Sequence, residues 1–92
     1  MSARPRLSEP MEIAKFWKNR KGEAVIVQLK EFEGRVLIDV RTHYTDAGGQ
    51  LKPTAKGLSL VILRLPELAA AIDKAHRKAV ELGLLETEGA AS

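Results

Sequence analysis

The sequence contains no cysteine, so the chain can form neither a disulfide nor a thiolate metal site. Because small secreted domains commonly depend on disulfides, this absence favours a reducing compartment, and we expect a cytoplasmic protein. No apolar run approaches the length that spans a membrane. The first ten residues carry charges with no apolar stretch behind them, so we expect neither a secretory signal nor a membrane partner.

Signals of catalysis and of metal binding are also missing. The glycine-rich stretch at residues 46–50, DAGGQ, lacks the spacing and the lysine of a phosphate-binding loop. His43 and His76 fall on different predicted elements without paired ligands, so a metal site is not expected. The sequence therefore predicts no enzyme activity, no cofactor and no metal ion.

What the chain does have is an uneven positive charge. Its 92 residues predict one domain with a modest core, and the net charge is +3. Residues 1–60 hold eleven Lys and Arg against seven Asp and Glu, whereas residues 61–92 hold four against five. A basic half favours a polyanionic partner such as nucleic acid, although an ordinary solvated surface also explains the charge alone.

Apolar alternation divides the chain into strands followed by a helix, an α+β fold. We expect a flexible arm at 1–11, a folded domain at 12–85 and a flexible tail at 86–92. The predicted strands cover residues 11–19, 24–32, 35–44 and 58–63. Residues 51–57 are predicted as an extended loop, because Pro53 is excluded from a central strand. The run LSLVIL at 58–63 predicts burial on both sides.

The C-terminal helix is predicted to begin near Pro66 and to end before Gly83. One face carries apolar residues at helical spacing, namely Leu68, Ile72, Ala75, Ala79 and Leu82. A helix of roughly 18 residues is about 27 Å long, so it covers one face of a four-stranded sheet only in part. The other face must stay wet or meet another copy.

Phe32 is predicted to face water, on the same side of its strand as Lys30. Arg35 and Arg41 share that face on the next strand. An exposed ring among cations is typical of single-stranded nucleic-acid binding, because a base stacks on the ring for roughly 1–3 kcal/mol. Alternatively, Phe32 caps a small apolar cluster with Leu37, and the pattern alone leaves both interpretations open.

Residues 31–60 contain a series of short motifs in a fixed order. They are Phe32-Glu33-Gly34-Arg35, Asp39-Val40-Arg41, His43-Tyr44, Gly48-Gly49, Lys52-Pro53 and Lys56-Gly57-Leu58-Ser59-Leu60. This stretch resembles the core of the positive-cofactor-four family of transcriptional coactivators, and the resemblance extends over residues 12–82. It implies a curved four-stranded antiparallel sheet with one C-terminal helix, dimerising through the helices, with paired channels for single-stranded DNA.

The resemblance also implies a set of nucleic-acid-binding residues, which are Lys30, Phe32, Arg35, Arg41, Tyr44, Lys52 and Lys56. In this assignment Phe32 and Tyr44 stack on bases, and Arg35, Arg41 and Lys56 meet phosphates. Binding would be largely independent of base sequence.

The chain departs from the family pattern at several positions. Glu33 and Ala55 stand where eukaryotic members carry basic residues, and Tyr44 replaces a tryptophan. Strict alternation places Tyr44 on the core face, so a bulge or a twist must intervene if it binds bases. The long serine-rich arm is missing, which fits a prokaryotic-type member. The sequence leaves open whether Trp17 and the basic turn at residues 18–21 contact nucleic acid.

We therefore expect a homodimeric single-stranded-DNA-binding protein that acts as a transcriptional coactivator or regulator, or in the handling of unwound DNA. Contact with the transcription machinery is implied, and the protein would be associated with the nucleoid if it is bacterial. RNA is an alternative ligand, because stacking and phosphate contacts do not exclude a 2′-hydroxyl. A protein-interaction module that recruits an acidic partner is an alternative of another class.

Overall fold

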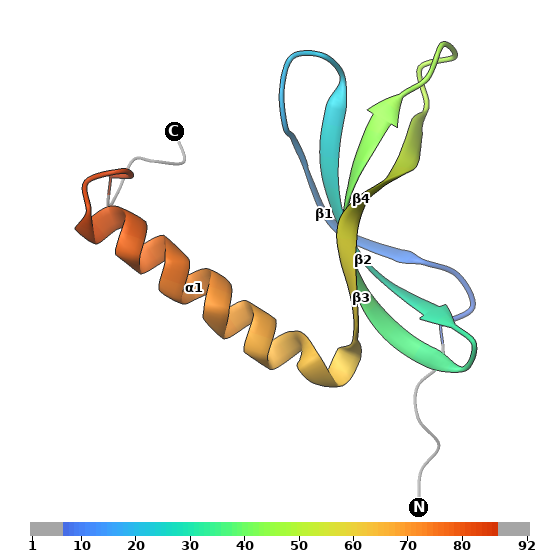
Figure 1. Cartoon of the computed structure of the whole chain (residues 1–92). Helices are drawn as coiled ribbons and strands as arrows, with labels where there is room; N and C mark the ends of the chain where they lie inside the picture. Colours follow the sequence, from blue (N-terminus) through green and yellow to red (C-terminus); the bar gives the residue numbers. More distant parts are fainter. Residues whose placement is uncertain (1–6, 87–92) are drawn as a thin grey trace, which may run out of the picture.

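The computed structural model describes residues 7–86. Its elements are β1 (Met11–Trp17), β2 (Glu23–Phe32), β3 (Arg35–Thr45), β4 (Leu51–Val61), a 3-10 turn η1 (Ile62–Arg64) and α1 (Leu65–Glu81). The strands form one antiparallel sheet in the order β1-β2-β3-β4, followed by the helix (Figure 1). The predicted α+β fold is confirmed. Residues 1–6 and 87–92, most of the predicted arm and tail, lie outside the described residues, and Met11 already belongs to β1.

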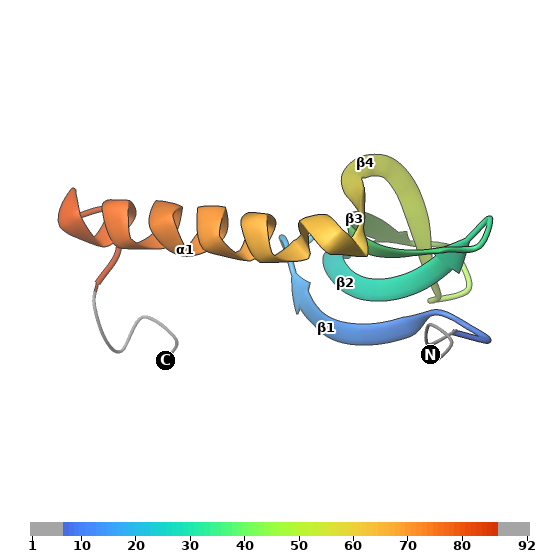
Figure 2. The ribbon, with the colours of Figure 1, turned by 90° about the horizontal axis from the view of Figure 1, so that it is seen from below.

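The hairpin between β2 and β3 is a two-residue turn. Glu33 and Gly34 both have positive φ, 51° and 81°, as a type I′ turn requires. Phe32 therefore pairs directly with Arg35, and the register continues without a shift to Glu23 and Tyr44. The strands are long and strongly curved, so that the two ends of the sheet are turned relative to each other (Figures 1 and 2).

The predicted loop at residues 51–57 was wrong, because this segment is the first part of β4. β4 lies at the edge of the sheet, where the missing N–H of Pro53 need not interrupt the hydrogen-bond ladder. Pro53 pairs with His43 and Gly57 pairs with Arg41, so four steps along β4 correspond to two along β3. The two extra residues of β4 form an irregularity between Pro53 and Gly57, and the pairing with β3 resumes at Gly57.

The predicted burial of residues 58–63 on both sides was also wrong. Leu58 is exposed, and Leu63 in η1 is 79% exposed. The physical reason is the edge position of β4, together with a helix that does not fold back over it.

The ends of α1 follow the predicted signals. Pro66 lies in its first turn. At the C-terminus Gly83 has φ of 80°, its N–H donates to the carbonyl of Val80 at 3.0 Å, and the N–H of Leu84 donates to Ala79 at 2.8 Å. This is the Schellman arrangement, which satisfies carbonyls that the helix leaves unpaired. The side chain of Leu84 remains exposed.

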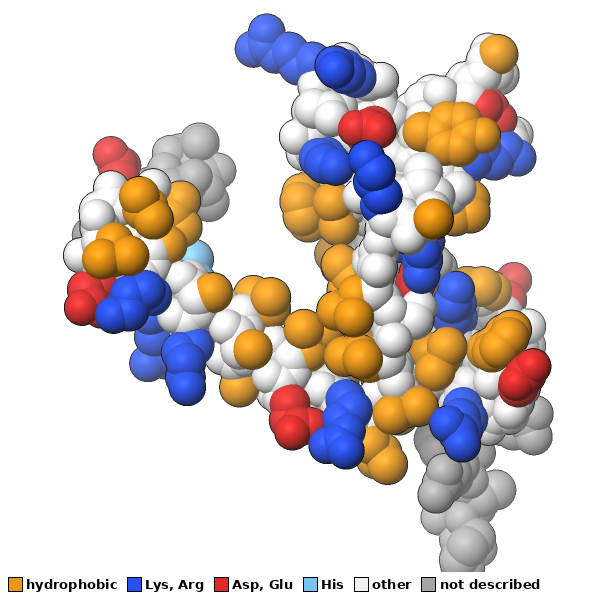
Figure 3. Space-filling view, viewed as in Figure 1, with side chains coloured by type: hydrophobic (Ala, Val, Ile, Leu, Met, Phe, Trp, Pro, Cys, Tyr) orange, Lys and Arg blue, Asp and Glu red, His pale blue; other side chains and the backbone are white. Residues whose placement is uncertain are grey.

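The helix extends away from the sheet and touches it mainly through η1 (Figures 1 and 2). Only Ala24, Ile26 and Ile38 are buried apolar residues in the described chain. The apolar face of α1 is left uncovered, with Ile72 and Leu82 exposed. Hydrophobic side chains continue from the first turns of the helix onto the adjoining sheet (Figure 3). One copy of the chain thus presents a large apolar surface.

Candidate nucleic-acid interface

One face of the sheet gathers most of the polar and basic residues singled out in the sequence. Residues directly opposite each other in antiparallel strands project to the same side. The pairs on this side are Ile26–Arg41, Gln28–Asp39, Lys30–Leu37 and Phe32–Arg35. We call this side the polar face. The structure therefore brings together Lys30, Phe32, Arg35 and Arg41, four of the seven predicted binding residues.

Phe32 lies at the end of the polar face and is 59% exposed. Its cross-strand neighbour Arg35 is also exposed and forms no ion pair within residues 7–86. A ring with this exposure is not a core residue. The ring and the guanidinium are both accessible to a ligand at the tip of the β2–β3 hairpin.

Asp39 is the centre of the polar face and is completely buried. Its carboxylate accepts hydrogen bonds from Arg41 (Nη2 at 2.9 Å, Nε at 3.2 Å), from the Ser59 hydroxyl and from Gln28 Nε2 at 3.4 Å. Lys30 Nζ lies 3.9 Å from the same carboxylate. A single acid thus holds side chains from β2, β3 and β4 in one network.

The network keeps Asp39 and Arg41 ionised. Burial alone would raise the pKa of Asp39, but the hydrogen bonds from Arg41, Ser59 and Gln28 outweigh it, so the pKa lies below its ordinary value. The hydrogen bond to Asp39 in turn raises the pKa of Arg41. The two side chains therefore form a stable charged pair at neutral pH.

Arg41 has little freedom to move. Besides Asp39, its guanidinium donates to the Thr54 carbonyl at 3.0 Å and to Ser59 Oγ at 3.2 Å. Nε, one N–H of Nη1 and both N–H of Nη2 are used in this way, which leaves one of its five donors. The residue predicted to meet phosphate is thus also a structural link between β3 and β4.

Sequence reasoning did not assign a role to Asp39. The signal that could have found it is the Asp-x-Arg spacing in Asp39-Val40-Arg41, which puts an acid and a base on one face of a strand. An acid on a strand face that otherwise carries cations is expected to be paired.

Tyr44 lies on the opposite side of the sheet from Phe32. It pairs with Glu23 on β2 and with Lys52 on β4, and alternation places it with Thr42 rather than with His43. The β2–β3 pairing has no register shift near Tyr44, and the shift in the β3–β4 pairing, between Arg41 and His43, comes from extra residues in β4. Tyr44 and Lys52 are both exposed, but the structure does not bring them onto the polar face.

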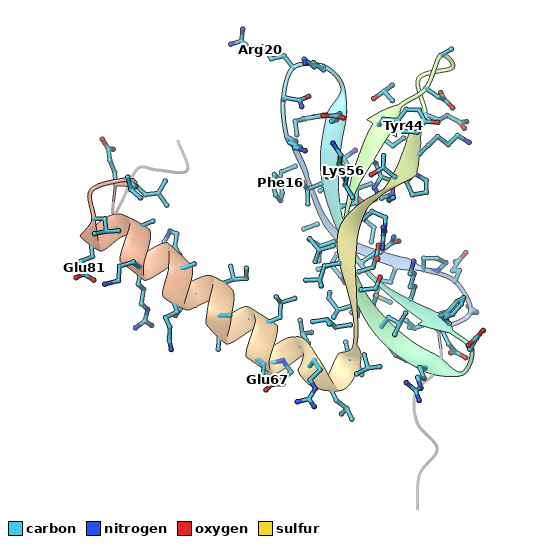
Figure 4. The ribbon with its side chains drawn as sticks, in the orientation of Figure 1. Phe16, Arg20, Tyr44, Lys56, Glu67 and Glu81 are labelled. Atoms are coloured by element: carbon cyan, nitrogen blue, oxygen red, sulfur yellow. The ribbon has the colours of Figure 1, made fainter. Side chains whose placement is uncertain are left out.

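Lys56 lies in the irregular part of β4, at the end of the sheet where Tyr44 is found (Figure 4). The positive charge of Lys56 acts on the carboxylate of Glu23 on β2. A hydrogen bond from Asn19 at 2.7 Å, with the nearby charges of Lys18, Lys56 and Lys21, holds the pKa of Glu23 below its usual value. Lys56 therefore belongs with the basic β1–β2 turn and is separate from the Asp39 network.

Within the described residues, no three His, Asp or Glu side chains lie close enough to hold a metal ion. None of the helical segments described is both long and apolar enough to cross a membrane.

Comparison with known proteins agrees with this geometry. Residues 17–71, more than half of the chain, match the family model described as Transcriptional Coactivator p15 (PC4). The chain belongs to the PC4 family. The predicted resemblance to this family is confirmed. The matched region begins at Trp17, so most of β1 precedes it.

Two relatives illustrate the PC4 relationship. A Drosophila melanogaster protein described as an RNA polymerase II transcriptional coactivator is 37% identical over 51 residues, which cover 55% of this chain. The match spans 46% of that relative's length. The crystal structure of a PC4 homolog from Burkholderia pseudomallei has a TM-score of 0.68 and 23% identity, covering 79% of this chain and 97% of the other. This likeness shows a shared fold.

Proposed function

We propose that this PC4-family chain is a homodimer that binds single-stranded DNA without base-sequence preference and acts in transcription or in the handling of unwound DNA in the cytoplasm. The observation that carries the proposal is the exposed Phe32 ring, flanked by Arg35 and Lys30 on the polar face. A ring supplies stacking that any base can use, and cations follow the phosphates. The family description supports the role in transcription.

Homodimerisation is supported by the uncovered helix. A partner helix packed against Ile72 and Leu82 would bury apolar surface that one copy leaves in water. A two-fold arrangement would place two polar faces in one particle, each able to bind a segment of strand. The predicted contact set also includes Tyr44, Lys52 and Lys56. Because the sheet is strongly twisted, a strand that passes over its edge could reach them.

A salt titration with matched ligands tests the proposal. Single-stranded DNA, duplex DNA and RNA of equal length are titrated with the chain at several salt concentrations. With about four to six phosphates neutralised, log K for single strands should fall by roughly 3–4 per tenfold rise in salt. Duplex DNA should bind more weakly, since its bases are not free to stack.

The other outcomes are equally informative. Equal affinity for duplex and single strand at every salt concentration would refute the stacking model and leave a plain basic patch. Tighter binding of RNA would favour the RNA alternative. Absence of binding to all three ligands would contradict nucleic-acid binding and favour recruitment of an acidic protein.

A further inference from the structure

We infer that Trp17 and Lys15 on β1 form a second stacking site, which takes a nucleobase of the same single strand that the polar face binds. This inference rests on the proposed function and adds a ligand position to it. Trp17 is the first residue of the region matched by the family model, and Lys15 precedes that region.

The register of the sheet places both residues on the polar face. Lys15 pairs with Ile26, which in turn pairs with Arg41 on the next strand. Trp17 pairs with Ala24, which in turn pairs with His43 on β3. Since directly opposed residues project to one side, Lys15 and Trp17 continue the polar face across β1.

Trp17 is exposed although the residue beside it is not. Its partner Ala24 is completely buried, whereas Trp17 is 59% exposed, the same fraction as Phe32. Lys15 Nζ lies 5.7 Å from the centre of the Trp17 ring, within the range of a cation–π interaction. The pair therefore repeats the combination found at Phe32, an accessible ring next to a cation.

The neighbouring residue supports this assignment by contrast. Phe16 pairs with Val25, so it projects to the opposite, apolar side of the sheet, on the side of β1 that looks toward α1 (Figure 4). Any apolar surface of a second chain that covers that side meets Phe16 rather than Trp17. Trp17 is followed by the basic residues Lys18, Arg20 and Lys21, which suit a polyanion better than an apolar partner.

The distance between the two rings sets the length of ligand that can use both. Trp17 lies opposite Ala24, and Phe32 is eight residues further along β2. An extended strand of that length spans about 26 Å before curvature is considered. A very short oligonucleotide can therefore occupy one ring only, whereas longer oligonucleotides can engage both, within the roughly 4–16 nucleotides typical of such sites.

The chain contains one tryptophan, which makes the test direct. Thymidine oligonucleotides of increasing length are added to the intact wild-type chain. Trp emission is recorded in parallel with the anisotropy of a dye on the oligonucleotide. We expect the emission to be quenched at saturation by the longer oligonucleotides. Trp17→Ala should weaken their binding about tenfold and leave the salt slope unchanged.

Two variants complete the design. Trp17→Phe, which keeps a ring, should restore most of the affinity lost in Trp17→Ala. Phe16→Leu, its matched control on the other side of the same strand, should bind like wild type.

The outcomes separate this inference from the proposed function. If anisotropy reports tight binding while Trp emission stays constant and Trp17→Ala binds like wild type, the second site is refuted and the proposed function stands. If anisotropy reports no binding, both fail. The emission measurement needs no variant, so it decides the matter even if Trp17→Ala does not fold.

Discussion

Asp39 Oδ1 lies 2.9 Å from Nη2 of Arg41, two residues further along the same strand. The acid is completely buried, and the base is one-fifth exposed. A cation held in this way keeps a fixed position, so a ligand that meets it need not order a flexible side chain. The pair thus makes part of the polar face rigid before any ligand arrives.

The first prediction concerns Asp39→Asn and acid. Because the folded pKa of Asp39 is lowered, its stabilisation is complete at neutral pH. That stabilisation declines as the pH falls through the unfolded value of about 3.9 and is lost below the folded pKa. We expect Asp39→Asn to be less stable than wild type by about 2 kcal/mol at pH 7, because Arg41 loses its charged partner.

Urea unfolding at a fixed protein concentration, measured from neutral pH to about pH 2, checks this. The gap between wild type and variant should close on acidification. Glu33→Gln, at an exposed turn position, is the control and should follow wild type. A constant gap across the whole range would contradict a role for the Asp39 charge.

The second prediction compares two arginines of the polar face. Arg35 is exposed, and its removal in Arg35→Ala should lower the salt slope of single-strand binding by about 0.7, one phosphate contact. Arg41 is already paired with Asp39, so Arg41→Ala should lower the slope by less while costing more folding stability. Salt titrations with urea unfolding of both variants measure the difference. Equal salt slopes and equal folding stabilities of the two variants would show that the Asp39–Arg41 ion pair affects neither DNA binding nor folding stability.

The third prediction concerns stacking at Phe32. Phe32→Ala should weaken single-strand binding by roughly 1–3 kcal/mol and leave the salt slope nearly unchanged, since no charge is removed. Because the ring is exposed, the midpoint of unfolding should stay close to that of wild type. A variant that unfolds, while any folded remainder binds normally, would show that the ring serves the fold instead.

The fourth prediction concerns α1. Ile72→Asp should dissociate the dimer or unfold it, because a charge would be buried at the interface without a partner. Lys74→Asp is the matched control, since two residues further along a helix lies on the opposite face. Sedimentation at micromolar concentration distinguishes the two. A folded wild-type monomer under these conditions would contradict dimerisation through the helices.

The fifth prediction concerns close packing between β3 and β4. A Cβ on Gly57 would lie 2.7 Å from the Val40 carbonyl oxygen and 2.8 Å from Arg41 Cα, both backbone atoms that cannot move aside easily. Gly57→Ala should therefore destabilise the chain by about 1–3 kcal/mol. Gly48→Ala, whose Cβ would meet only Asp46 Oδ1 at 3.5 Å, should be close to neutral in thermal unfolding.

The sequence was sufficient to predict the order of elements and the exposure of Phe32. Period-two alternation in β2 and β3 and the tight turn at Glu33 and Gly34 determine which side chains share a face. Other local signals, Pro66 and Gly83, identified the two ends of α1. These features depend on residues near one another in the chain, which is why a single sequence shows them.

The wrong predictions depend on neighbours that local patterns do not reveal. Pro53 argues against a central strand, but β4 has an open edge, a fact of topology. Burial of residues 58–63 was expected from their apolar run, yet the helix leaves Leu58 and Leu63 exposed. Asp39 also accepts a hydrogen bond from Ser59, twenty residues away in the chain. Its spacing to Arg41 therefore reveals the ion pair but not the link to β4.

The strand order itself has a consequence for the rate of folding. Each strand pairs with the strand that follows it in the chain, and the connections are short, so the loops that must close are small. Sheets with such local contacts form faster than those whose strands are far apart in sequence. Hairpins close within microseconds, whereas association of two chains slows as the protein is diluted. If the proposed homodimer forms, refolding should therefore show a fast phase that is independent of protein concentration, followed by a slower phase that depends on it.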